Sequence, residues 1–166
     1  KASVIVAFYN NIKALKLVLS ALEAQSMTDF EVVIADDGST EDTKALINSF
    51  KLKSTVNIVH VWHEDTGFRR SKILNKAIAS SSADYIVQID GDCIMHKDFV
   101  KDHQTFARIG LFLYGSRVNI QESFLDELFK TKNIKFSFLS KGIKKRTRAM
   151  RIPLLSAVYK PGSELS

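Results

Sequence analysis

The sequence has one cysteine, two prolines and no apolar run long enough to cross a membrane. A single cysteine excludes an internal disulfide framework, which favours a reducing compartment and predicts a cytoplasmic protein. A membrane-spanning helix needs about 20 apolar residues, so none is predicted, and no segment resembles a signal peptide. With 166 residues, 45% of them hydrophobic, the chain is long enough for one compact core.

Acidic residues are absent from residues 130–160, which carry ten Lys or Arg. The net charge of +6 therefore belongs to this segment and not to the whole chain. Within it, residues 141–160 interleave basic and apolar side chains, which favours peripheral contact with an anionic membrane surface or an anionic glycan. A basic loop with acidic partners elsewhere is the alternative. Aromatic residues are too few there to favour nucleic acid, so no nucleic-acid partner is expected.

Short apolar runs alternate with segments of helical periodicity. Strands are predicted at residues 3–8, 30–35, 56–62, 85–89 and 111–115, and helices at 12–25, 39–50, 73–80, 98–109 and 123–130. Ser39 followed by Asp42 predicts a capping box at the start of the second helix. The alternation predicts an α/β fold, a Rossmann-like and mostly parallel sheet with helices on both faces. We expect residues 1–120 to form the main domain and 121–166 a basic helical and loop segment.

Polar side chains follow the predicted strands at their carboxyl ends. Tyr9 and Asn10 follow the first strand, Asp36 and Asp37 the second, residues 63–65 the third, and Asp90 and Asp92 the fourth. The carboxyl ends of parallel strands meet at one edge of a sheet, where ligands bind. These side chains are therefore expected to converge. His63 is interpreted as a surface or packing residue, with contact to a metal or diphosphate as the alternative.

Asp90, Gly91 and Asp92 come directly after an apolar run that predicts a buried strand. Two carboxylates this close repel each other unless a cation or hydrogen-bond donors neutralise them. Oxygen ligands favour Mg²⁺ or Mn²⁺, often with a substrate diphosphate completing the shell. The alternative is an ordinary turn, because Asp-Gly is a frequent turn dipeptide.

Four stretches together resemble a known family. "SVIVAFYNN", "FEVVIADDGST", "HEDTGFRRSKILNKAI" and "ADYIVQIDGDCIM" occur in the order and spacing typical of the nucleotide-sugar-binding portion of family 2 glycosyltransferases. The third stretch is similar to bacterial glycosaminoglycan and other polysaccharide synthases. The resemblance implies a GT-A fold and, over residues 1–120, a subdomain that binds a nucleotide-diphosphate sugar.

The resemblance also implies roles for single residues. Ala7, Phe8 and Tyr9 match the segment that lines the base and ribose of the donor. Asp37 matches the carboxylate that accepts the uracil N3–H in relatives that use a UDP-sugar. In the same way, Asp65 matches an acidic position on the pocket wall, Arg69 a basic residue available to the diphosphate, and Asp90, Gly91 and Asp92 the D-x-D motif.

The resemblance further implies that Asp92 and Asp90 hold Mn²⁺ or Mg²⁺, with Asp90 nearer the ribose. The implied reaction inverts the anomeric centre and passes the sugar to a glycan or lipid-linked acceptor, as in polysaccharide biosynthesis. The family's catalytic base is an acid well downstream of D-x-D. Glu122, Asp126 and Glu127 are interpreted as the solvated face of a helix, and Glu164 lies three residues from the end. The base is therefore expected outside this chain, which is interpreted as truncated.

Three other functions fit parts of the pattern. A phosphoacceptor receiver domain would use Asp36-Asp37, Asp90 and Lys160-Pro161, but its acidic pair ends the first strand and not the second. A nucleotidyltransferase should carry a Gly-rich basic loop after the first strand, and "FYNNIKA" has none. A non-enzymatic basic binding module would leave the acidic strand ends unexplained.

Overall fold

The structure is a computed structural model that describes residues 1–151 of the 166. Its centre is a four-stranded parallel sheet in the order β3-β2-β1-β4. The strands are β1 (Ala2–Phe8), β2 (Phe30–Asp36), β3 (Asn57–Trp62) and β4 (Tyr85–Asp90). The predicted α/β class and parallel sheet are confirmed, and each of these four strands lies within two residues of its predicted bounds.

Position in the sheet explains the burial of each strand. The central strands β1 and β2 are covered on both faces, and their sequences are correspondingly apolar between Ser3 and Glu31 at one end and Asp36 at the other. The edge strands β3 and β4 are only partly buried. The prediction of a buried strand at residues 85–89 is therefore wrong in that respect, since Ile86 is 36% exposed and Gln88 is exposed. These side chains are exposed because β4 is an edge strand and lacks a neighbouring strand on one side.

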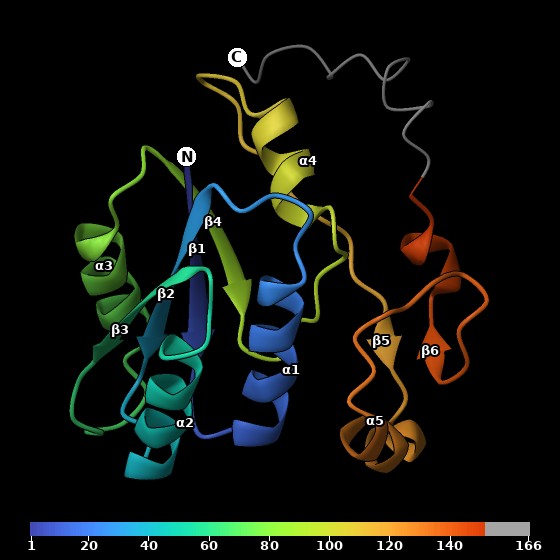
Figure 1. The fold of residues 1–166 in the computed structure, drawn as a ribbon, viewed down its shortest axis with the longest axis horizontal. Coiled ribbons are helices and arrows are strands. Elements are labelled where there is room, and N and C mark those ends of the chain that lie inside the picture. The colour runs from blue at the N-terminus through green and yellow to red at the C-terminus, as the bar shows by residue number, and fades with distance from the viewer. Residues whose placement is uncertain (152–166) are drawn as a thin grey trace. The chain divides into compact units, whose positions relative to one another are not determined.

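Helices cover both faces of the sheet, as predicted (Figure 1). The helices are α1 (Ile12–Glu23), α2 (Glu41–Lys51), α3 (Arg70–Ser80) and α4 (Phe99–Phe106). One core cluster joins β1 and β2 to α1, α2 and α4, with Leu15, Leu19 and Ile47 almost fully buried. A smaller cluster joins Ile5 of β1 to Ile73 of α3 on the opposite face. The apolar stripes of the helices thus divide the core into two layers.

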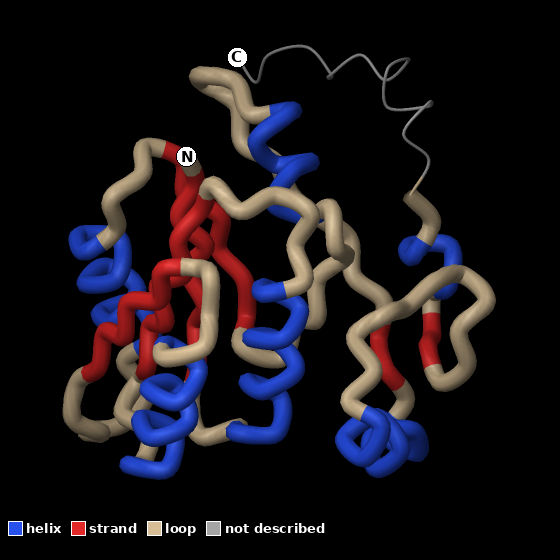
Figure 2. The backbone as a smooth tube through the Cα atoms, viewed as in Figure 1, coloured by secondary structure: helices blue, strands red, loops and turns tan. Residues whose placement is uncertain are grey.

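Two local predictions are wrong. Residues 111–115 form no strand, and Figure 2 draws the chain after α4 as a loop. A strand needs a ladder partner, and no strand among residues 1–151 pairs with this one. The Ser39 side chain also forms no capping box. It accepts the N–H of Asn10 at 2.9 Å, and α2 begins after Thr40 without a side-chain cap bond.

A buried carboxylate holds the amino ends of the strands together. Glu31 Oε1 accepts the hydroxyl of Ser3 at 2.6 Å and the N–H of Ser82 at 2.5 Å. Burial alone would raise the pKa of Glu31, but these hydrogen bonds together lower its pKa below the ordinary value. The ionised carboxylate therefore links β1 and β2 to the loop before β4, at the end of the sheet opposite the acidic rim.

The described chain divides into two compact units. The first contains the parallel sheet and comprises residues 1–114 and 127–135. The second contains residues 115–126 and the described part from 136 on, with the antiparallel pair β5 (Asn119–Ile120) and β6 (Ile143–Lys144). The 3-10 helix η1 (Glu122–Phe124) leads into α5 (Leu125–Thr131), and η2 (Arg146–Ala149) follows β6. The functional division at residue 120 stays a prediction.

Within residues 1–151, no helix is both long enough and apolar enough to pass through a bilayer.

Candidate functional site

The carboxyl ends of all four strands meet at one rim of the sheet. The register pairs Ala7 with Asp90, Phe8 with Asp36, and Asp36 with Trp62. Backbone hydrogen bonds continue this alignment just past the strands, from Asp37 N–H to Phe8 O at 3.0 Å and from Gly91 N–H to Ala7 O at 2.7 Å. The predicted convergence of the strand ends is confirmed.

A pocket of about 270 Å³ opens at this rim. Ligand pockets usually measure about 300 to 1,000 Å³, so this one is slightly smaller than that range. It is lined by Ala7, Phe8, Tyr9, Ala35, Asp37, Asp65, Gly67, Phe68, Arg70 and Ile73. Five of the predicted nucleotide-binding residues are therefore brought together in its wall, while Arg69, Asp90 and Gly91 lie outside this lining.

Asp37 is buried at the base of the pocket and has partners on both oxygens. Its Oδ1 is 2.6 Å from Nε2 of His63, and its Oδ2 accepts the N–H of Arg69 at 3.0 Å. An ionised carboxylate can only accept, so Nε2 of His63 carries the proton. Each carboxylate oxygen keeps a second lone pair, which leaves Asp37 able to accept further hydrogen bonds.

His63 was interpreted from the sequence as a surface or packing residue, and it is instead a partner of Asp37. The ring is buried, and its Nδ1 has no hydrogen-bond partner within residues 1–151. Within the described residues, His63 therefore makes its side-chain hydrogen bond through Nε2 alone, to Asp37. The sequence does contain a signal for this contact. His63 comes directly after β3, and the register of β3 with β2 pairs the preceding residues, Trp62 and Asp36.

A hydrogen bond between side chains closes one side of the pocket. The hydroxyl of Tyr9 donates to Asp65 Oδ2 at 2.9 Å, and the N–H of Gly67 donates to Asp65 Oδ1 at 3.1 Å. The Gly67 N–H and the Tyr9 hydroxyl hold the pKa of Asp65 below its ordinary value. The same hydrogen bond and the negative charge of Asp65 raise the pKa of Tyr9.

The two arginines at the start of α3 point to different partners. The Arg69 guanidinium donates to the backbone carbonyl of Glu64, and its Nε is buried without a partner in the described structure. Arg70 lines the pocket, and its Nη2 is 2.6 Å from Asp90 Oδ1. Sequence reasoning missed Arg70. Its spacing of three and four residues from Ile73 and Leu74 puts it on the inward face of the helix, which is the signal that identifies it.

Asp90, Asp92 and Cys93 form a cluster of possible metal ligands. One ligand atom from each residue lies within 4.8 Å of the others. Gly91 is buried between the two carboxylates, and an added Cβ there would lie 2.7 Å from Cδ2 of Phe8 and 3.0 Å from the Ala7 carbonyl oxygen. The chain therefore passes so close to the end of β1 that a side chain at this position would force its neighbours to shift.

This donor set fits a hard divalent cation. The two carboxylates suit Mg²⁺ or Mn²⁺, which bind through few protein oxygens and leave positions for other ligands. Asp92 is exposed and Asp90 is half-buried, so the group faces solvent on one side. Cys93 is a soft donor and adds little to a site for these ions.

The basic segment is only partly described. Lys141, Lys144, Arg146 and Arg148 are exposed, while residues 152–160 of the predicted membrane-contacting stretch lie outside the described residues. Lys160-Pro161 and Glu164 lie outside them as well. Glu122, Asp126 and Glu127 are exposed around η1 and α5, which confirms their interpretation as a solvated face.

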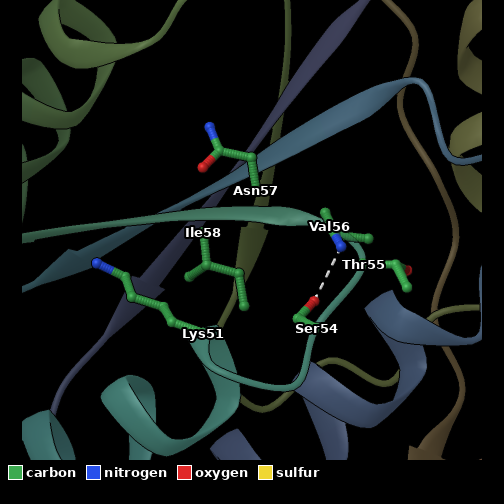
Figure 3. A pocket seen from close by; sticks show the side chains of 6 residues that line it. All are labelled: Lys51, Ser54, Thr55, Val56, Asn57 and Ile58. Atoms are coloured by element: carbon green, nitrogen blue, oxygen red, sulfur yellow. Dashed lines mark hydrogen bonds between the residues drawn. The ribbon is translucent and has the colours of Figure 1, made fainter.

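A second hollow, of about 390 Å³, lies at the amino end of β3 (Figure 3). It is lined by Lys51, Ser54, Thr55, Val56, Asn57 and Ile58. The Ser54 hydroxyl accepts the Val56 N–H at 3.0 Å and so shapes the turn. This hollow holds no cluster of acidic or metal-ligating side chains, and it lies at the end of the strand opposite the acidic rim.

A family model described as glycosyl transferase family 2 matches residues 3–161. The chain belongs to this family. Membership decides against the receiver-domain and nucleotidyltransferase interpretations, and it agrees with the resemblance found in the four motifs. The fold is the α/β GT-A fold, which the structural relatives below share.

Among curated relatives, the chain is 27% identical over 124 residues to chondroitin synthase from Escherichia coli, covering 73% of this chain and 18% of the relative. It is 30% identical over 108 residues to TarS from Staphylococcus aureus, a poly(ribitol-phosphate) beta-N-acetylglucosaminyltransferase, covering 64% and 18%. The chain thus spans about a fifth of the length of these relatives.

Solved structures agree with these matches. The crystal structure of S. aureus TarS 1-349 in complex with UDP-GlcNAc superimposes with a TM-score of 0.54 at 30% identity, covering 64% of this chain and 30% of TarS 1-349. The mannosyltransferase PcManGT from Pyrobaculum calidifontis, in complex with GDP-Man and Mn²⁺, gives a TM-score of 0.55 at 23% identity, covering 63% and 31%. The second likeness concerns the fold alone.

Proposed function

We propose that this chain is the donor-binding part of a glycosyltransferase that transfers a sugar from a nucleotide diphosphate, a UDP-sugar, to a glycan or lipid-linked acceptor. The observation that carries the proposal is the shared rim. A buried carboxylate acceptor, Asp37, lines the pocket just after β2, and the paired carboxylates of Asp90 and Asp92 stand at the end of β4, at the same rim with β1 between the two strands. The UDP-GlcNAc bound to TarS, a relative 30% identical, supports a uridine donor.

The base of the donor is recognised by Asp37 in this proposal. Uracil presents an N–H at N3, and the free lone pairs of Asp37 accept it while His63 and the Arg69 N–H hold the carboxylate in place. Cytosine presents an acceptor at N3 and would face the same carboxylate with repulsion. Ala7, Phe8 and Tyr9 provide the wall beside the base and ribose, and Asp65 fixes the Tyr9 hydroxyl.

The diphosphate of the donor lies toward the D-x-D motif in this proposal. Asp92 and Asp90 would hold Mn²⁺ or Mg²⁺, which stabilises the negative charge on the departing diphosphate. Gly91 lets the backbone run close beneath the two carboxylates. Arg69 and Arg70 supply positive charge at the start of α3, a place where anions are favoured.

The acceptor side of the reaction is proposed to lie outside this chain. A single displacement that inverts the anomeric centre needs a general base at the acceptor hydroxyl. The acids after Arg117 within the described residues are Glu122, Asp126 and Glu127, all of them exposed. We therefore assign the base to a part of the enzyme other than residues 1–151, and we expect this chain to bind donor without transferring sugar by itself.

The proposed site of action is the cytoplasm, at an anionic membrane surface contacted through residues 141–160. The exposed basic residues of the described part, 141–151, support this contact. Sedimentation with vesicles that contain an anionic lipid should pull down the protein at low salt and release it at high salt. Equal sedimentation with neutral vesicles would contradict the membrane contact without affecting the donor site.

Base recognition can be tested by calorimetric titration of UDP, CDP, GDP and dTDP into the protein with Mn²⁺ present. UDP should bind about 10 to 100 times more tightly than CDP, the difference expected when a charged hydrogen bond is lost. Equal affinity for UDP and CDP would remove Asp37 from base recognition. Absence of binding by all four nucleotides would contradict the proposal for this chain.

A further inference from the structure

Arg70 is paired with a carboxylate that the proposed function assigns to the metal. Its guanidinium Nη2 lies 2.6 Å from Asp90 Oδ1, and the two side chains are 39% and 47% exposed. Arg70 is the first residue of α3 and also lines the nucleotide pocket, whereas Asp90 is the last residue of β4. The pair therefore joins the nucleotide pocket to the D-x-D cluster.

A divalent cation and this guanidinium compete for the same carboxylate. Both are positive, so a metal bound at Asp90 repels Arg70 while it remains at 2.6 Å. The guanidinium needs another anion if it leaves. A diphosphate is a suitable one, because its oxygens match the paired donors of arginine. The diphosphate would enter the pocket that Arg70 already lines.

We propose that Arg70 is a switch that couples metal binding to donor binding. Without donor, Arg70 neutralises Asp90 and weakens the binding of a divalent cation. When a nucleotide diphosphate enters, Arg70 pairs with the phosphate oxygens and releases Asp90 to the metal. Metal and donor then bind cooperatively, because each removes the other's obstacle. This inference rests on the proposed donor site, and it adds the order and the coupling of binding.

The first test uses Mn²⁺ alone, measured by the loss of the free-ion signal in electron paramagnetic resonance. Arg70→Gln should bind Mn²⁺ about threefold or more tightly than the wild-type protein, since a competing charge is gone. Lys76→Gln is the matched control, because Lys76 is an exposed lysine on the same helix and the change in net charge is identical. It should stay near the wild-type affinity.

The gain must be specific to the position of Arg70. Equal affinity in Arg70→Gln and the wild-type protein, or an equal gain in Lys76→Gln, would overturn the switch. Arg70→Met, which keeps the apolar stem and removes the charge, should show the same gain as Arg70→Gln. Agreement of these two variants, with unchanged circular dichroism spectra, separates the effect from a folding defect.

The second test measures the coupling itself. In the wild-type protein, saturating UDP should raise Mn²⁺ affinity about tenfold or more, and in Arg70→Gln this ratio should fall several-fold. An unchanged ratio would overturn the proposal. If the wild-type protein binds no UDP, the proposed function fails, and the experiment with Mn²⁺ alone still decides whether Arg70 competes for Asp90.

Discussion

Two glycines beside the pocket allow a sharp test of how its loops are held. Gly38 and Gly67 both have positive φ, at 97° and 93°. A Cβ on Gly38 would lie 2.7 Å from Cα of Asp65 and 2.8 Å from its backbone nitrogen, whereas a Cβ on Gly67 would meet nothing within 4 Å. A substitution therefore strains the backbone at both positions, but it causes a steric clash only at Gly38.

Replacing Gly67 by alanine should cost about 1 to 2 kcal/mol of unfolding free energy, the cost of a left-handed conformation in a residue with a Cβ. Replacing Gly38 should cost a further 1 to 3 kcal/mol or so, because the methyl group displaces the backbone of Asp65. In a chain of this size the second variant should melt about 2 to 12 °C below the first.

Thermal and urea unfolding followed by circular dichroism measures both variants against the wild-type protein. Gly38→Ala should also weaken UDP binding more than Gly67→Ala, because moving Asp65 breaks its hydrogen bond to Tyr9. Equal stability of the two variants would refute the reasoning, since the close approach of Asp65 to Gly38 would then have no energetic consequence.

Three further predictions concern the rim and the opposite end of the sheet. Gly91→Ala should cost about 1 to 3 kcal/mol of stability, because the new methyl group overlaps the Phe8 ring; an unchanged urea midpoint would count against this packing. Glu31→Gln should destabilise at pH 7. The difference in unfolding free energy between this variant and the wild-type protein should shrink below about pH 4.5. The lowered pKa of Glu31 contributes stability that is fully present above the pKa of the unfolded state and is lost as the wild-type carboxylate becomes protonated. A difference that does not change with pH would contradict the assignment. His63→Leu should weaken UDP binding about tenfold, and His63→Gln less, because only glutamine can replace the donor to Asp37; calorimetry showing equal losses would argue that His63 only fills space.

The central part of the fold could be predicted because strands that are buried on both faces need apolar residues at successive positions. The strands β1 and β2 are covered on both faces, so their apolar runs are continuous and their bounds come out within a residue. The same pattern located β4 correctly but wrongly predicted that it is buried, because this run lies at an edge of the sheet. Whether a strand has a neighbour on each side depends on the order of strands in the whole sheet. The residues of the strand itself contain no information about that order.

The site could be predicted as far as strand ends determine it. Asp37, Asp65 and Asp90 follow strands, and the parallel sheet brings them to one rim. The pairing of side chains could not be predicted. Arg69 and Arg70 are neighbours in sequence, and only the rotation of α3 turns one to a backbone carbonyl and the other to Asp90.

The capping box failed for a related reason. Ser39 has the right spacing from Asp42 to cap its own helix. Its hydroxyl instead accepts the N–H of Asn10, which is 29 residues away in sequence. Long-range hydrogen bonds of this kind are set by the strand order and leave no local signal.

The most direct test of the central claim is calorimetric titration of UDP with Mn²⁺ and with EDTA. The wild-type protein, Asp92→Asn and Asp84→Asn are compared, since Asp84 is an exposed carboxylate at the opposite end of β4. We expect UDP to bind only with Mn²⁺, with Asp92→Asn at least about tenfold weaker and Asp84→Asn unchanged. UDP binding that survives both EDTA and the loss of Asp92 would show that the acidic rim does not hold a metal against the nucleotide diphosphate.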